Sequence, residues 1–258
     1  MAGDAALALV GALFGALFGS FLNVCIVRLP KDQSVVRPRS RCPRCGAQLA
    51  WYDNIPVLSW LVLRGRCRGC QLPISPMYPV VELLVAAFWG WMAWRHGFGL
   101  EGVRGALFGT LLIGIAFTDA REYIIPDEFS VGGLVAGLLL AAAAGLPAFQ
   151  VAALGAAVGF ALLWLVGVGG TWVFKEEAMG GGDIKMMAMV GAFVGWQGVL
   201  LTVFLGALLG TLIFLPLMLL GRKKLVPFGV FLAMGGLATY LFGPAIFEWY
   251  GRYLGVGA

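Results

Sequence analysis

The sequence predicts an all-α membrane protein that crosses the bilayer about eight times and carries a cysteine-bearing loop between its first two spans. Hydrophobic residues make up 60% and charged residues 12% of its 258 residues. A soluble domain of this size has no interior large enough to bury so much apolar surface. The apolar residues also occur in long runs, many of which approach the roughly 20 residues that a membrane helix needs. Disorder is excluded because disordered chains are poor in apolar residues.

The first apolar run, Ala5 to Val27, contains no charged residue. Asp4 precedes it in place of a basic residue, and the run is too long for the apolar part of a signal peptide, so we expect a retained helix. Seven further spans are expected near residues 78–94, 105–118, 130–147, 150–174, 186–196, 198–220 and 228–247. The 186–196 span is short, and one long helix is the alternative to a break at Trp196–Gly198.

The long polar segment after the first run is strongly basic. Between residues 28 and 79 it holds nine of the chain's 18 lysines and arginines, against only Asp32 and Asp53. Basic loops stay on the cytoplasmic side, so this segment is expected in the cytoplasm. Simple alternation of the spans then places most of the remaining basic residues on the same side. The excess positive charge suits anionic lipid headgroups and does not require a nucleic-acid partner.

Four of the five cysteines form two Cys-x-x-Cys pairs, Cys42 with Cys45 and Cys67 with Cys70, separated by 21 residues. This spacing is typical of a four-thiolate zinc ribbon. The cytoplasm keeps thiols reduced, and a loop this small needs a metal to supply its folding energy. We therefore expect a closed, structural Zn²⁺ site, with two disulfides or unrelated cysteines as the alternatives.

Two aspartates stand at the ends of apolar runs and are the candidates for chemistry. Asp119 follows the run 111–118, and Asp183 closes the sequence Gly180-Gly-Gly-Asp183. The expected topology places both at the cytoplasmic face, although nothing local joins them. Two adjacent carboxylates share a proton, which suits amide hydrolysis by activated water. The glycines would admit an extended substrate backbone, while a helix N-cap is the structural alternative for Asp183.

Six ordered motifs make the chain resemble the type IV prepilin peptidases, which are bifunctional leader peptidases and N-methyltransferases. The motifs are Gly19–Val24 with Arg28–Pro30, Trp51–Trp60 between the cysteine pairs, Pro73–Ser75 with Tyr78–Glu82, Asp119 with Ile125–Asp127, Gly180–Lys185, and Pro227–Gly229. The resemblance covers nearly the whole chain.

The resemblance implies that Asp119 and Asp183 are the catalytic aspartates. Gly180, Gly182, Lys185 and Asp127 would support the loops that carry them. The substrates would be prepilins or type II secretion pseudopilins, cleaved at the cytoplasmic face of the bacterial inner membrane. The new N-terminal residue would then be methylated with S-adenosylmethionine as methyl donor, and the cysteine loop is a feature of the bifunctional members.

Three further polar or small residues are weaker candidates for substrate binding or methyl transfer. Glu82 could serve there or could pair with a loop arginine, while Asn23 and Gly19 also suit helix packing. The expected division of the chain is a first helix (1–29), a zinc-binding loop domain (30–79) and a membrane peptidase domain (80–258). Alternative functions are another G-x-G-D intramembrane protease, a cation transporter that uses the two aspartates, or a zinc-ribbon scaffold.

Overall fold

The computed structural model describes residues 4–176, 179–219 and 227–255, and these residues form helices without a named strand. The predicted all-α class is therefore confirmed. The chain divides into two compact units: the first ends at Gly114 and the second begins at Ile115, inside helix α4 (Leu100–Glu122). The boundaries expected near residues 29 and 79 separate a first helix, a zinc-binding loop domain and a peptidase domain by function, not by compactness. That functional division stays a prediction.

The first unit contains α1 (Ala5–Arg28), α3 (Met77–His96) and the start of α4. Between α1 and α3 lie two 3-10 turns, η1 (Leu29–Lys31) and η2 (Trp51–Asn54), and the short helix α2 (Leu58–Val62). Helix α1 packs against α3 through Gly11, Gly15 and Gly19, where an added Cβ would come within 2.8 Å of an α3 atom. Small residues four apart let two membrane helices approach closely.

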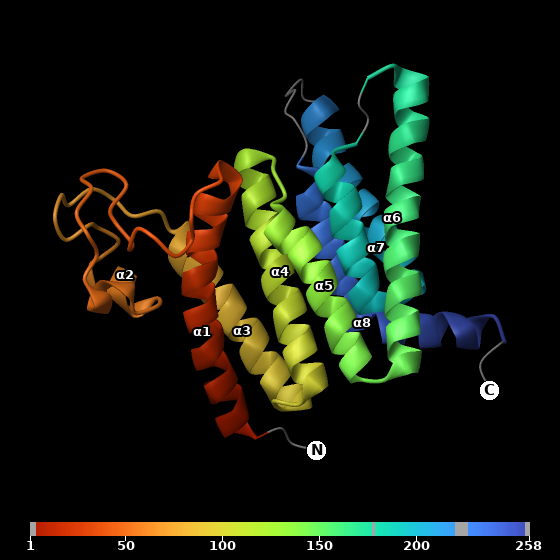
Figure 1. Cartoon of the computed structure of the whole chain (residues 1–258), viewed down its shortest axis with the longest axis horizontal. Helices are drawn as coiled ribbons and strands as arrows, with labels where there is room; N and C mark the ends of the chain where they lie inside the picture. The colour runs from red at the N-terminus through yellow and green to blue at the C-terminus, as the bar shows by residue number, and fades with distance from the viewer. Residues whose placement is uncertain (1–3, 177–178, 220–226, 256–258) are drawn as a thin grey trace. The chain divides into compact units, whose positions relative to one another are not determined.

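The second unit contains the end of α4, then α5 (Asp127–Ala143), α6 (Leu146–Phe174), α7 (Gly181–Leu219) and α8 (Phe228–Tyr253). Helix α7 contacts α5, α6 and α8, so it organises this unit (Figure 1). Facing glycines again permit the contact with α8, because a Cβ on Gly235 would lie 2.6 Å from the Thr202 carbonyl oxygen. Thr202 also donates a hydrogen bond to Thr239 of α8 (3.1 Å).

Six helices among the described residues are long and apolar enough to cross a membrane: α1, α3, α4, α6, α7 and α8. The chain is thus a multi-pass membrane protein, but the expected count of eight spans is not confirmed. Helix α5 has only 17 residues. Helix α7 is continuous apart from a kink at Gly195 (φ 71°), one residue before the expected break at Trp196–Gly198. The last residue of the expected span 198–220 lies outside the described residues.

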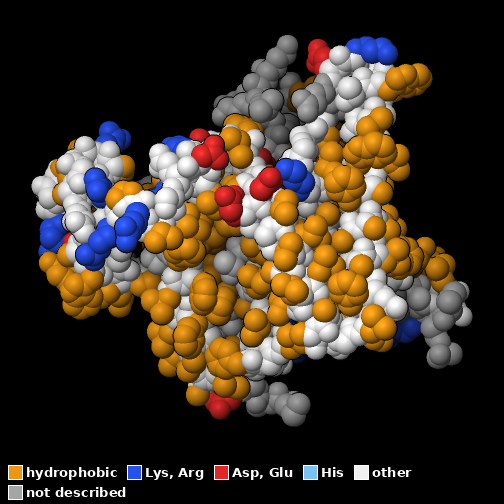
Figure 2. All heavy atoms as spheres, in the orientation of Figure 1, with side chains coloured by type: hydrophobic (Ala, Val, Ile, Leu, Met, Phe, Trp, Pro, Cys, Tyr) orange, Lys and Arg blue, Asp and Glu red, His pale blue; other side chains and the backbone are white. Residues whose placement is uncertain are grey.

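Large apolar side chains cover the outer surfaces of the helices. On α1, Leu9, Leu13 and Leu17 are each about 60% exposed. Figure 2 shows hydrophobic side chains spread over the helices, and lysines and arginines gathered on the loop between α1 and α3. Exposed apolar area on this scale would be a liability in water, and it fits contact with lipid acyl chains.

Candidate active site and metal centre

The second unit brings Asp119 and Asp183 together. Asp119 lies in the last turn of α4 and is only 6% exposed. Its Oδ2 accepts a hydrogen bond from the backbone N–H of Val230 in the first turn of α8 (3.0 Å). Asp183 is the third residue of α7, and its carboxylate is close enough to interact electrostatically with that of Asp119. Three helix ends that are distant in the sequence therefore meet around one carboxylate pair.

Asp183 does not serve as a helix cap. Its Oδ1 is buried and has no hydrogen-bond partner among the described residues. A buried polar atom without a partner is costly and calls for a ligand or a water molecule. The preceding Gly180 lies beside it, since a Cβ there would sit 3.5 Å from Asp183 Oδ2. The absence of a side chain at Gly180 therefore leaves space beside the Asp183 carboxylate, and one oxygen of that carboxylate stays available.

Ile125, which follows the end of α4, lies against the starts of both α7 and α8. An added Cβ on Gly182, in α7, would lie 3.1 Å from the Ile125 Cβ, and one on Gly229, in α8, would lie 2.8 Å from its Cδ1. The same hypothetical Cβ on Gly229 would also lie 2.9 Å from Asp119 Oδ2. Sequence reasoning assigned no role to Ile125, Gly229 or Val230. The sequence features that could have drawn attention to Ile125 and Gly229 are the motifs Ile125–Asp127 and Pro227–Gly229.

Lys185 and Asp127, which were expected to support the catalytic loops, form an ion pair with Nζ–Oδ1 and Nζ–Oδ2 distances of 2.8 and 2.9 Å. The pair joins the N-terminal ends of α7 and α5. Both side chains are largely exposed, and exposed ion pairs contribute at most about 1 kcal/mol. Neither hydrogen-bonds to an aspartate of the site among the described residues, so any support from them acts through the positions of the helices.

The four paired cysteines gather into one cluster within the first unit. Their sulfur atoms all lie within 4.8 Å of one another, and Cys42 Sγ lies 3.9 Å from Cys70 Sγ. Four sulfurs placed tetrahedrally about 2.3 Å from a metal are about 3.8 Å apart, whereas a disulfide needs about 2.0 Å. The cysteines are free thiols. The cluster could therefore hold a metal ion, and its geometry does not suit the disulfide alternative.

The two Cys-x-x-Cys segments are structural copies of each other. The N–H groups of Cys42 and Cys67 donate to the carbonyl oxygens of Ala47 and Leu72, each at 2.9 Å. Each segment is also closed by one isolated antiparallel bridge. The residue after the second cysteine has a positive φ in both copies, 72° at Gly46 and 58° at Gln71. Such tight turns aim both sulfurs of a pair at one point.

This equivalence predicts opposite effects of two substitutions on metal affinity. Gly46→Ala should weaken binding by about 1 kcal/mol, since a Cβ is disfavoured at this φ, whereas Gln71→Gly should strengthen it by about 0.5–1 kcal/mol. Competition between the protein and a chelator for Zn²⁺ measures both effects. Gly69→Ala is the matched control, because its Cβ would meet its neighbours only at ordinary contact distances. Equal weakening by all three substitutions would contradict the backbone argument.

The thiols of the cluster interact strongly. Hydrogen bonds from the Cys45 and Arg44 backbone N–H groups, with smaller help from neighbouring thiols, lower the pKa of Cys42 to about 6 despite desolvation. At Cys70 a hydrogen bond from the Leu72 N–H lowers the pKa, but the opposing effects of desolvation and the neighbouring thiols are together larger. The net result is a pKa raised to about 11.

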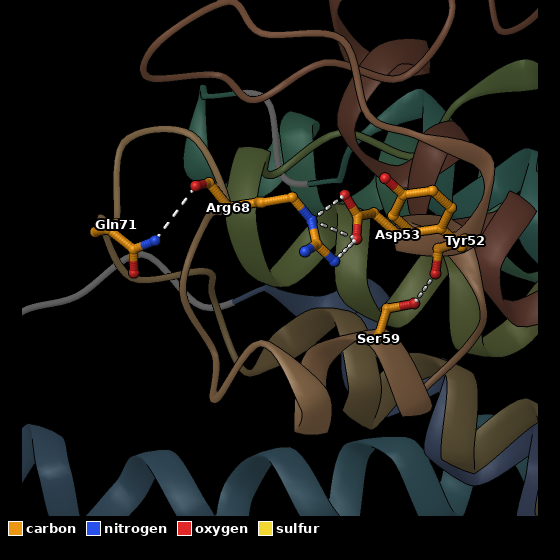
Figure 3. A network of polar contacts seen from close by, with 5 residues as sticks. All are labelled: Tyr52, Asp53, Ser59, Arg68 and Gln71. Carbon is orange, nitrogen blue, oxygen red and sulfur yellow. Dashed lines mark hydrogen bonds and ion pairs between the residues drawn. The ribbon is translucent and has the colours of Figure 1, made fainter.

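The Trp51–Trp60 segment is anchored to the second cysteine pair. Arg68 forms a forked hydrogen bond with Asp53 (Nη2–Oδ1 2.7 Å, Nε–Oδ2 3.1 Å) and lies 5.3 Å from the centre of the Tyr52 ring. The hydrogen bonds to Asp53 and its charge raise the pKa of Arg68. Ser59 donates to the Tyr52 carbonyl and Gln71 to that of Arg68, which completes the network in Figure 3.

The three weaker candidates make structural contacts in the halves of α1 and α3 that adjoin the cysteine-bearing loop. Glu82 is buried on α3, and its Oε2 accepts a hydrogen bond from the Val57 N–H (2.7 Å), although Val57 has an unfavourable φ of 62°. Asn23 donates to the Tyr78 carbonyl (3.0 Å), and Gly19 contacts the Glu82 backbone. The Glu82 contact joins the loop to α3, and the Asn23 and Gly19 contacts join α1 to α3. Roles of these residues in substrate binding or methyl transfer stay predictions.

The fold and the site define a class of protein. It is a multi-pass helical membrane protein with a carboxylate pair in one unit and, in the other, a four-cysteine cluster that could hold a metal ion. Residues 13–96 match the bacterial peptidase A24 N-terminal domain, and residues 106–215 match the type IV leader peptidase family. The chain belongs to the type IV leader peptidase family. No solved structure matches it significantly.

Similar proteins carry the name prepilin leader peptidase/N-methyltransferase. The one from Aeromonas hydrophila is 36% identical over 92% of this chain and 91% of its own length, and the one from Pseudomonas aeruginosa is 33% identical over 97% and 95%. The Myxococcus xanthus protein is 47% identical over 81% of this chain, which spans 62% of that relative.

Proposed function

We propose that this protein cleaves the leader peptide of prepilins or type II secretion pseudopilins and then methylates the new N-terminus. The observation that carries the proposal is the meeting of Asp119 with Asp183, whose Oδ1 is buried and unpartnered. The names of its relatives support the substrate class and both activities. The basic loop supports an active site at the cytoplasmic face of the inner membrane.

Cleavage would use the two carboxyl groups as one acid–base pair. One takes a proton from water as the oxygen attacks the scissile carbonyl carbon, and the other donates a proton to the carbonyl oxygen. The tetrahedral intermediate then breaks at its C–N bond, and the nitrogen leaves with a proton from the pair. The Val230 N–H holds Asp119, so this half of the pair needs little reorganisation.

One experiment tests both activities. The purified protein is incubated with a prepilin and S-adenosylmethionine, and mass spectrometry identifies the N-terminus of the product. We expect loss of the leader followed by a gain of one methyl group. Intact prepilin after incubation with correctly inserted protein would contradict the proposal, and so would cleavage of a signal peptide in preference to the prepilin.

Gly229→Ala should reduce prepilin cleavage by about 10²-fold. The added Cβ would press on Asp119 Oδ2 and on Ile125, and small displacements of a catalytic group have effects of this size. Initial cleavage rates measure the loss. Gly132→Ala on α5 is the matched control, because its Cβ would have no neighbour within 4 Å. A similar rate loss in both variants would show that Gly229 has no special relation to Asp119.

The cysteine module would bind one structural Zn²⁺ through Cys42, Cys45, Cys67 and Cys70. The ion would supply folding energy to a loop that buries few apolar side chains. Methylation would depend on this module, and S-adenosylmethionine would supply the methyl group.

Glu82 would position the Trp51–Trp60 segment for the methylation reaction. Glu82→Ala removes the acceptor for the Val57 N–H, so methylation should fall about tenfold while cleavage changes little. Glu82→Gln keeps an acceptor oxygen and should restore most of the methylation. The measurement is the methylated fraction of cleaved product. If Glu82→Gln were as defective as Glu82→Ala, the charge of Glu82 and not its tether would be required.

A further inference from the structure

A basic pocket opens directly after the first membrane helix. It has a volume of about 330 Å³ and is lined by Arg28, Gln33, Ser34, Arg37, Pro38 and Arg41. Arg28 is the last residue of α1 and donates a hydrogen bond from Nη1 to the Ser34 carbonyl (2.9 Å). The Ser34 hydroxyl in turn accepts from the N–H groups of Val36 and Arg37 (3.3 Å each). These bonds fold the chain so that three arginines line one cavity.

The positive charge of this pocket is not neutralised by the described part of the protein. Its lining contains three arginines and no carboxylate, and none of the three forms an ion pair with a described Asp or Glu. Asp32 is the only acidic residue between Arg28 and Arg41, and it does not line the cavity. Three forked donors around a cavity of this size suit the oxygen atoms of a phosphate group.

The position of the pocket indicates where such a phosphate would come from. The apolar span that contains α1 ends at Lys31, so the pocket begins at the end of a membrane-crossing segment. Phe14, Phe21 and Arg28 follow one another at seven-residue intervals and therefore share one face of α1. Phe14 and Phe21 are about half exposed. An acyl chain on this apolar face would lead to a headgroup beside Arg28.

We infer that this pocket, lined by Arg28, Arg37 and Arg41, is a discrete binding site for the phosphate of an anionic membrane phospholipid. Binding at such a site is distinct from the diffuse electrostatic attraction that any basic loop has for a negatively charged membrane. The site lies within the first unit and does not depend on the proposed peptidase or methyltransferase reactions. Its occupant would hold the start of the cysteine-bearing loop at the membrane surface.

Lipid titration of the full chain in detergent, followed by native mass spectrometry, tests the inference. The probes are phosphatidylglycerol, phosphatidylcholine with the same acyl chains, and inorganic phosphate. Phosphatidylglycerol should bind with a stoichiometry of one, and Arg37→Gln/Arg41→Gln should weaken that binding at least about tenfold. The matched control, Arg39→Gln/Arg64→Gln, removes the same charge from the same loop outside the pocket and should leave the affinity within about twofold.

Two further arms separate the alternatives. Arg37→Lys/Arg41→Lys keeps the charge but loses the forked geometry, so its affinity should lie between those of the wild type and the glutamine variant. Unchanged melting temperatures without lipid show that the variants fold. The inference is overturned if the control pair weakens binding as much as the pocket pair, or if phosphatidylcholine binds as tightly. Inorganic phosphate that competes at an equal concentration would instead show a site for a free anion.

Discussion

Asp119→Asn and Asp183→Asn are each expected to lower prepilin cleavage by about 10³-fold or more while the protein remains folded in the membrane. Either substitution removes one of the two groups that must exchange protons with water and with the scissile bond. Asparagine has nearly the same shape and retains an oxygen that can accept the Val230 hydrogen bond, so the packing around Asp119 should survive. Initial rates of leader removal from a purified prepilin are the measurement.

Glu128→Gln is the matched control for this pair, because Glu128 is an exposed acidic residue in the first turn of α5. Its rate should stay within about twofold of the wild type. Normal cleavage by Asp119→Asn or Asp183→Asn would reject the aspartate mechanism. If the wild type did not cleave prepilin but conducted cations in reconstituted vesicles, the cation-transporter alternative would replace the peptidase proposal.

Serine at any of the four clustered cysteines is expected to remove bound zinc and to abolish methylation, with much less effect on cleavage. A hydroxyl is a poor zinc ligand, and structural zinc contributes about 10–16 kcal/mol of binding free energy in small modules. The wild type should contain one zinc ion per chain by elemental analysis. The ratio of methylated to unmethylated cleaved product then reports the second activity.

Cys25→Ala controls for the loss of a thiol, since Cys25 is buried in α1 away from the cysteine pairs. It should retain both the metal and the methylation. Absence of zinc in the intact protein would reject the metal assignment. Equal loss of cleavage and methylation in the Cys67→Ser variant would indicate a general folding role for the module and would reject its special link to methylation.

Composition and motif spacing were enough to predict the helical class and the four-cysteine cluster, because both depend on local patterns. Apolar runs report membrane helices directly, and two Cys-x-x-Cys turns bring their own sulfurs together. The number of membrane spans was harder to predict from the sequence. Helix α5 is at the short limit of a membrane helix, and the kink at Gly195 depends on one backbone angle that the surrounding apolar residues do not reveal.

The surroundings of the aspartates could be predicted only in part. The positions of Asp119 and Asp183 at the ends of apolar runs drew attention to them, and their approach required a tertiary structure. The contact of Gly229 with Asp119, and the position of Ile125 against both Gly182 and Gly229, arise where the ends of α4, α7 and α8, which are far apart in the sequence, come together. No periodicity within one segment contains that information.

The division of the chain inside α4 has an evolutionary consequence. All the groups assigned to peptide hydrolysis follow Ile115, while the cysteine ligands, Glu82 and the arginine pocket precede Gly114. Selection could therefore discard or replace one chemical capability without rebuilding the other. A lineage that no longer needs modified pilin ends could shorten the loop between α1 and α3 and still keep a working protease.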